Sequence, residues 1–203
     1  MKKVIGIICL LLVGKLSAEE FKPGVHFQEV AQRSNGKNEV VEFFSFGCPH
    51  CFSFFPAWKE IKGKMKGKAK LRESHVLGLG YASNEMQIAL SKAFVIAKLL
   101  KVEDKVLPDI FHRIHVDKKG FASENEIKDV FVENGIDKAR YEKMESGFTV
   151  ANLLRKMEKD YKSYNVANHG VPAVIVNGRY KVLGGVNSAE EYARLLDYLL
   201  AKN

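Results

Sequence analysis

The stretch FFSFGCPHCFSFF, residues 43–55, places two cysteines, separated by two residues, within a run of aromatic side chains. Just before them, residues 39–46 (EVVEFFSF) are apolar and rich in β-branched and aromatic types, which predicts a buried strand. Cys48 and Pro49 follow, and proline is favoured in the first turn of a helix because its missing N–H is not needed there. We therefore predict that a strand passes directly into a helix at the cysteines.

The elements around this stretch occur in the order of a thioredoxin fold. Residues 69–77 alternate and predict a second strand, while residues 173–176 (AVIV) and 179–183 flank an Asn-Gly turn and predict a hairpin. An amphipathic helix closes the chain, and a weak strand near residues 25–27 precedes all of these elements. With the intervening residues removed, the predicted order is β-α-β-β-β-α.

Residues 81–165 follow a different period. Apolar positions recur there with helical spacing, and SENE at 123–126 has the spacing of a capping box, which predicts a helix start. The predicted fold class is therefore α/β, a thioredoxin fold with a large inserted all-helical domain. The predicted organisation is a signal peptide over 1–18, a discontinuous thioredoxin-like domain over 19–80 and 166–203, and a helical insertion over 81–165.

Residues 1–18 have the parts of a secretory signal peptide. A positively charged start precedes an apolar run over residues 4–14, which is too short to span a bilayer as a helix. Ala18 then offers a small residue for cleavage before Glu19. An uncleaved anchor or a buried N-terminal helix is the alternative. The signal peptide predicts export of the chain.

The charge balance is only mildly basic once this segment is removed. The whole chain has 32 basic and 24 acidic residues, and cleavage after Ala18 removes three lysines and no acid, so the net charge falls from +8 to +5. Lysines cluster over residues 59–70 (KEIKGKMKGKAK), but no aromatic residues stand among them to stack on bases. We interpret them as a solvated helix end and loop and expect no nucleic-acid partner.

Cysteine usage indicates reactivity rather than a structural framework. Of the three cysteines, Cys9 lies in the signal peptide, so the exported chain keeps only Cys48 and Cys51. A bridge between them closes a very short loop and gains little chain entropy, although a structural bridge remains an alternative. A zinc site needs two further ligands, and the histidines are scattered along the chain. Haem attachment needs histidine directly after the second cysteine, where Phe52 stands. We expect no metal and no cofactor beyond the disulfide.

The residues between the cysteines favour a thiolate, which is both nucleophile and leaving group in disulfide exchange. At the start of a helix, unpaired N–H groups and the helix dipole favour negative charge on Cys48. Cys51, one turn later, would be the resolving thiol. Pro49 helps to start the turn, and His50 can donate to the Cys48 thiolate or add positive charge. A stabilised thiolate favours the reduced enzyme, so the disulfide form becomes oxidising.

Two further features support redox chemistry. If the Val171–Pro172 bond is cis, a tight turn can lie against the cysteines, and Val171 can pair its backbone with an extended substrate peptide. The alternative is an ordinary trans proline at a strand boundary. Glu42 lies in the apolar strand before Cys48, and a buried carboxylate is costly unless it is used or paired. It could relay a proton to or from Cys51, or it could reach water at a strand edge.

These motifs resemble those of the DsbA family of bacterial periplasmic dithiol oxidases. The resemblance rests on EFFSFGCPHC at 42–51, on GVPAVIVNGRY at 170–180, and on the helical insertion and signal peptide, and it covers essentially the whole mature chain. It implies that the enzyme donates its disulfide to newly exported cysteine-containing proteins and is reoxidised by a quinone-coupled membrane partner resembling DsbB. We expect a monomer. The positions that match the family are Glu42, Cys48, Pro49, His50, Cys51, Val171 and Pro172.

Two residues depart from the family pattern. Gly47 precedes Cys48 where relatives often carry a bulky aromatic, which would open the approach to the sulfur. Glu73 falls on the neighbouring predicted strand where some relatives have a lysine near the buried glutamate. Two carboxylates close together raise one pKa, so the proton-relay role of Glu42 depends on this neighbour.

Other functions remain open at this point. A disulfide isomerase or reductase belongs to the same chemical class, but isomerases of this compartment usually add a dimerisation domain, and the stretch before Val25 is too short for one. A peptide-binding chaperone with structural cysteines, or a metal carrier, belongs to a different class. Replacing Cys48 with alanine would stop an oxidase and leave a chaperone working.

Overall fold

The computed structural model describes residues 21–31, 36–77 and 82–202. The predicted signal peptide, with Cys9, and the predicted boundary at 80/81 lie outside the described residues. Within the described part, no helix combines the length and the apolar character needed to cross a membrane.

A five-stranded mixed sheet forms the centre of the fold. Its spatial order is β1-β5-β4-β2-β3, in which β2 and β3 are parallel and the other neighbours are antiparallel. The strands are β1 (Phe27–Glu29), β2 (Glu39–Phe44), β3 (Lys70–His75), β4 (Ala173–Val176) and β5 (Tyr180–Val182). The weak strand expected near residues 25–27 is β1, displaced two residues along the chain.

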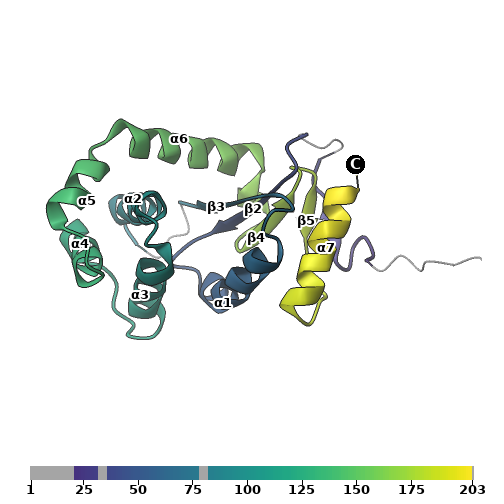
Figure 1. Cartoon of the computed structure of the whole chain (residues 1–203), viewed down its shortest axis with the longest axis horizontal. Helices are drawn as coiled ribbons and strands as arrows, with labels where there is room; N and C mark the ends of the chain where they lie inside the picture. Colours follow the sequence, from purple (N-terminus) through teal and green to yellow (C-terminus); the bar gives the residue numbers. More distant parts are fainter. Residues whose placement is uncertain (1–20, 32–35, 78–81, 203) are drawn as a thin grey trace, which may run out of the picture.

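Helix α1 follows β2, and α7 closes the chain, while the other helices of the described residues lie between β3 and β4 in sequence. Figure 1 shows α2 to α5 gathered at one end of the molecule, with α6 running back from them towards the strands. The helices are α1 (Pro49–Lys64), α2 (Asn84–Leu100), α3 (Glu103–His115), α4 (Glu124–Glu133), α5 (Lys138–Glu145), α6 (Phe148–Ser163), the 3₁₀ turn η1 (Val166–Asn168) and α7 (Ala189–Ala201).

The two faces of β2 enter different cores because successive strand residues point to opposite sides. Val40 packs with Trp58 of α1 and the leucines of α7. Val41 and Phe43 pack instead with Val166 of η1 and with Ile175. The end of β2 therefore lies between the α1–α7 layer and the segment that leads into β4.

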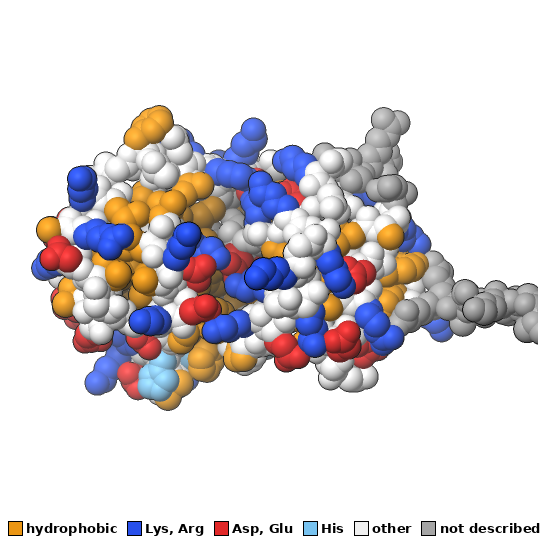
Figure 2. Space-filling model, in the orientation of Figure 1, with side chains coloured by type: hydrophobic (Ala, Val, Ile, Leu, Met, Phe, Trp, Pro, Cys, Tyr) orange, Lys and Arg blue, Asp and Glu red, His pale blue; other side chains and the backbone are white. Residues whose placement is uncertain are grey.

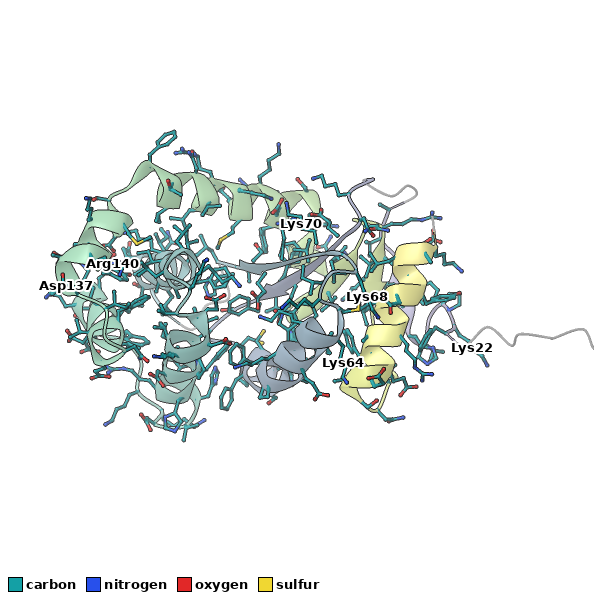
Figure 3. The ribbon with its side chains drawn as sticks, in the orientation of Figure 1. Lys22, Lys64, Lys68, Lys70, Asp137 and Arg140 are labelled. Carbon is teal, nitrogen blue, oxygen red and sulfur yellow. The ribbon has the colours of Figure 1, made fainter. Side chains whose placement is uncertain are left out.

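Ion pairs on the surface join the end of α1 and the loop that follows it to α7. Lys64 contacts Glu190 at 2.7 Å and Lys68 contacts Asp197 at 2.5 Å, and both lysines are labelled beside α7 in Figure 3. The predicted solvated lysine stretch thus has partners, although these exposed pairs contribute little to stability.

Helix α6 covers an apolar hollow. A cavity of about 270 Å³ lies between β3, α2 and α6, with Phe94, Leu99 and Met157 in its wall and with Lys98 and Lys156 among its lining residues. Figure 2 shows hydrophobic side chains on this face with lysines and arginines around them. Neither cysteine lines this cavity.

Candidate active site

Cys48 is the N-cap residue of α1, so the chain changes from extended to helical at its sulfur. Its Sγ accepts a hydrogen bond from the N–H of Cys51 at 3.3 Å, and its thiol donates to the carbonyl of Val171 at 3.4 Å. Both cysteines are free thiols, so the site is in its dithiol form. Pro49 occupies the first turn, as its fixed φ favours.

The two thiols differ in access and in acidity. Cys48 is half-buried, whereas Cys51 is 1% exposed. Burial raises the pKa of the Cys51 thiol, and the neighbouring Cys48 and Glu42 raise it further. An incoming thiolate can therefore reach Cys48, whereas the buried Cys51 can react only with a disulfide that has already formed at Cys48.

Two histidines fix the segment that carries Cys48. The N–H of Phe46 donates to Nε2 of His75 at 3.2 Å, and Nε2 of His115 donates to the carbonyl of Phe46 at 2.7 Å. His75 is buried and neutral, since burial lowers its pKa to about 3, and its Nδ1 donates to Ser91 Oγ at 2.7 Å. The sequence alone does not connect these histidines with the site, because they lie far from Cys48 in the chain.

His115 also supports the active-site helix. Its ring stacks on Phe52, with centroids 5.0 Å apart and planes 12° from parallel. Phe52 of α1 is therefore held on one side by the end of α3.

The segment before β4 reaches the sulfur. The Val171–Pro172 peptide bond is cis, and the carbonyl of Val171 is the acceptor for the Cys48 thiol. Val171 is half-buried, and the Lys181 ammonium on β5 donates to the carbonyl of His169 at 2.9 Å, which ties the segment to the sheet. The backbone of Val171 thus lies beside the atom where exchange would take place.

Glu42 lies beneath the cysteines on β2, which pairs with β4 on one side and with β3 on the other. It is 4% exposed, so it does not reach water at a strand edge. Its register partner on β3 is Glu73. Burial raises the pKa of Glu42 well above the usual range, and the Glu73 carboxylate raises it further. Glu42 therefore keeps its proton to a higher pH than an ordinary carboxyl group.

Glu73 is ionised, and two lysines that the sequence did not connect with the site hold it. Its carboxylate accepts from Lys62 Nζ of α1 at 2.5 Å, from Lys98 Nζ of α2 at 2.8 Å and from Trp58 Nε1 at 3.2 Å. Burial opposes the charge, but the two ammonium groups outweigh it and lower the pKa of Glu73.

His50 and Pro49 are exposed at the start of α1. Within the described residues, the hydrogen bonds at Cys48 Sγ involve Cys51 and Val171, and none comes from His50. The contact between His50 and the sulfur stays a prediction for the thiolate form. Among residues 21–31, 36–77 and 82–202, no three His, Cys, Asp or Glu side chains converge in a way that could hold a metal ion.

Known proteins share this arrangement along nearly the whole chain. The chain is 30% identical over its full length to the thiol:disulfide interchange protein DsbA of Buchnera aphidicola subsp. Schizaphis graminum, with 100% of both proteins covered. It is 33% identical to the protein of the same name from Azotobacter vinelandii, over 91% of this chain and 86% of that one. The crystal structure of the disulfide oxidoreductase DsbA from Proteus mirabilis superimposes with a TM-score of 0.75 at 26% identity, covering 90% of this chain and 96% of that one.

These likenesses confirm the predicted fold class, a thioredoxin fold with a helical insertion. The sequence profile of the DSBA-like thioredoxin domain matches residues 39–197, which include both cysteines, Glu42 and the Val171–Pro172 segment. The chain therefore belongs to the DSBA-like thioredoxin domain family and is a thiol:disulfide oxidoreductase.

Proposed function

We propose that the chain works as a dithiol oxidase that donates a Cys48–Cys51 disulfide to newly exported proteins. The observation that carries this proposal is the position of Cys48 Sγ at the N-cap of α1, within 3.3 Å of the N–H of Cys51. First-turn N–H groups and the helix dipole stabilise a thiolate at this position. A stabilised thiolate favours the dithiol form of the enzyme, so its disulfide tends to oxidise other thiols.

The exchange takes two steps. A substrate thiolate attacks Cys48 Sγ, a substrate–Cys48 disulfide forms, and the Cys48–Cys51 bond breaks so that Cys51 leaves as a thiolate. A second substrate thiolate then attacks the substrate sulfur and releases Cys48 as a thiolate. Two electrons pass from the substrate dithiol to the cysteine pair. The two substrate protons are released, and Cys51 takes up one proton.

Glu42 is the group we propose as the proton donor to Cys51. A thiol whose pKa is raised by burial needs a proton when it leaves the disulfide. A buried carboxyl group with a raised pKa can supply that proton and recover it when the enzyme is reoxidised. Glu73 stays ionised between its two lysines and does not compete for this role.

Residues near the exposed side of Cys48 would receive the substrate. The Val171 backbone, 3.4 Å from the sulfur through its carbonyl, can pair with an extended peptide beside Pro172. Pro49 starts the turn that presents the sulfur, and His50 places an imidazole at the exposed rim.

The cellular setting follows from the family resemblance and the leader sequence. We propose export to the periplasm by cleavage of residues 1–18, substrates among exported cysteine-containing proteins, and reoxidation by a quinone-coupled membrane protein similar to DsbB. The working form is proposed to be a monomer that needs no cofactor besides its own disulfide.

A redox titration of the mature chain against glutathione tests the direction of the reaction. The two enzymes are compared at the same ratio of reduced to oxidised glutathione. At a ratio where a reductase has its cysteines as a disulfide, an oxidase should have them as thiols. The oxidised chain should also form a disulfide in a reduced, unfolded two-cysteine protein, and Cys48→Ala should not. If the cysteine pair of the chain is instead a disulfide at these glutathione ratios, the chain is a reductase. If the wild type oxidises no substrate, and Cys48→Ala suppresses aggregation as well as the wild type does, the chain is a chaperone.

A further inference from the structure

A cavity of about 530 Å³ opens next to the segment that carries Cys48, although neither cysteine lines it. Its wall includes Gly47 and Pro49, the two chain neighbours of Cys48, so the cavity begins at the backbone that carries the reacting sulfur. From there it extends between the start of α2 and the connection from α3 to α4. Its volume lies within the range of about 300–1,000 Å³ found for ligand pockets.

Four apolar side chains form part of the wall of this cavity. Met86 and Leu90 of α2, Ile114 of α3 and Phe121 of the α3–α4 connection line it. The unbranched, polarizable side chain of Met86 adapts to irregular shapes. The wall therefore suits a bulky apolar side chain of variable shape.

The connection that carries Phe121 is held in place. The guanidinium of Arg113 lies over the Phe121 ring, 4.6 Å from its centroid. Arg113 also donates to the carbonyl of Gly120 at 3.3 Å and pairs with Glu126 of α4. These contacts fix the wall, so the cavity is formed before any ligand arrives.

The polar groups in the wall leave little scope for a basic ligand. The Nε2 of His115 is committed to the carbonyl of Phe46, and its ring is stacked on Phe52. Lys118 is exposed and brings a positive charge to the cavity. A lysine or arginine side chain would meet a like charge there, whereas an apolar side chain would not.

Because Gly47 has no side chain, only backbone atoms stand at this position between Cys48 and the apolar residues of the cavity wall. Val171 does not line the cavity, although its carbonyl is 3.4 Å from Cys48 Sγ. A peptide bonded to Cys48 therefore meets two separate surfaces, the Val171 backbone and the cavity. An extended peptide advances about 3.3 Å per residue, so a side chain one or two residues from the substrate cysteine can reach a cavity that begins next to Cys48.

We propose that the cavity beside Gly47 is a substrate subsite, which takes a bulky apolar side chain within two residues of the cysteine that attacks Cys48. This inference rests on the proposed exchange at Cys48 and adds to it a preferred class of substrate sequence. Gly47 and Phe121 are the residues that set the preference, the first by leaving the entrance open and the second by forming the apolar wall.

Matched dithiol peptides test the subsite. The oxidised mature chain is mixed in a stopped-flow instrument with peptides that differ only by Phe, Leu, Ala or Lys at one of the two positions on either side of the cysteine. At one position or more, the Phe peptide should react about tenfold faster than the Ala peptide, and the Lys peptide should be the slowest. In Gly47→Phe and Phe121→Ala, the Phe/Ala rate ratio should fall towards one.

The ratio is compared within each variant, so a general change in the reactivity of Cys48 cancels. If Gly47→Phe does not fold, Met86→Ala removes apolar surface from the same wall. Val132→Phe, on the exposed surface of α4 outside the cavity, is the control and should keep the wild-type Phe/Ala ratio. The subsite is overturned if the protein oxidises dithiothreitol and the peptides but oxidises all peptides at equal rates. It is also overturned if the Phe/Ala rate ratio is unchanged in every cavity variant. Failure to oxidise any of these dithiols would instead overturn the proposed function.

Discussion

Glu42 on β2 and Glu73 on β3 are direct partners in the parallel register, yet the pKa of the Glu42 carboxyl is raised and that of the Glu73 carboxyl is lowered. Glu73 is ionised because Lys62 and Lys98 contact it at 2.5 and 2.8 Å. Glu42 has no such ammonium contact among the described residues, and its pKa is raised by burial and by Glu73. Burial, and after it the negative charge of Glu73, therefore raises the pKa of Glu42, even though Lys62 and Lys98 lower it.

Replacing Glu73 with glutamine should destabilise the reduced protein. The substitution leaves Lys62 and Lys98 without their shared partner, and both lysines are partly exposed, so we expect a loss of about 2 kcal/mol rather than the full cost of breaking a buried pair. Since the pKa of Glu73 is lowered in the folded state, its contribution is present above pH 4.5 and is lost as the pH falls. Urea unfolding at several pH values measures both effects.

The matched control is Lys64→Gln, which removes the exposed pair with Glu190. Exposed pairs are screened by solvent, so its urea midpoint should stay close to that of the wild type. A midpoint for Glu73→Gln as high as that of this control would contradict the argument.

Replacing Glu42 with glutamine should stabilise the reduced protein at neutral pH. A folded-state pKa raised above 4.5 means that the folded protein binds the proton more tightly, so the wild type loses stability as the pH rises from 4.5 through the raised value. Glutamine cannot ionise and avoids this loss, which amounts to about 1.4 kcal/mol for each pH unit that separates the folded-state pKa from the unfolded-state pKa. The unfolding free energies of the two proteins should converge near pH 4.5 and separate above it. Parallel curves over this pH range would show that the pKa of Glu42 is not raised.

The local part of the site could be predicted from the sequence. The β2–α1 junction depends on an apolar run followed by Cys48-Pro49, and these signals act over a few residues, so the structure begins α1 at Pro49 with Cys48 as its N-cap. The final helix likewise starts at Ser188, whose hydroxyl accepts from the Glu191 N–H at 3.1 Å.

Contacts between distant elements could not be predicted in this way. Lys62 and Lys98 come from different helices, and their shared contact with Glu73 depends on how α1 and α2 pack over β3. The sequence pattern around Lys62 indicates only a solvated stretch. His75 and His115 meet only at the backbone of Phe46, which no spacing rule indicates.

The capping box predicted at 123–126 gave the correct helix start, but neither of its two hydrogen bonds is formed among the described residues. Ser123 is the N-cap of α4, but its side chain makes no capping hydrogen bond. The Glu126 carboxylate instead accepts from the N–H of Ala122 at 3.2 Å and pairs with Arg113. A tertiary ion pair has therefore fixed the position of Glu126, and the helix begins where the motif placed it.

Replacing His75 with phenylalanine should weaken the anchoring of the Cys48 segment. The ring can still pack against Phe44 and Phe46, but the Phe46 N–H loses its acceptor, which we expect to cost about 1–3 kcal/mol at neutral pH. The Ser91 hydroxyl loses the bond from His75 and keeps its bond to the carbonyl of Gln87. Burial lowers the pKa of His75 from 6.5 to about 3, so its neutral form contributes stability that is lost as the pH falls through this range. The variant should therefore show a flatter acid dependence in urea unfolding than the wild type.

His112→Phe supplies the comparison for that experiment. His112 is on the exposed face of α3 beside Asp117, so its replacement removes a histidine and leaves the bond between His75 and Phe46 in place. An equal flattening in both variants would assign the effect to general loss of histidine rather than to the bond with Phe46.

The two cysteines should differ sharply towards an alkylating reagent. In the reduced protein at about pH 7, iodoacetamide should modify Cys48 at least tenfold faster than Cys51, because the thiolate is the reacting species. Cys48 is half-buried at a helix start, whereas Cys51 is 1% exposed and its pKa is raised by burial, by Cys48 and by Glu42. Peptide mass spectrometry after timed quenching gives both rates. In urea the difference between the two rates should disappear, since unfolding removes both the helix start at Cys48 and the burial of Cys51. Equal rates in the folded protein would instead show that this structure does not separate the attacking and resolving roles.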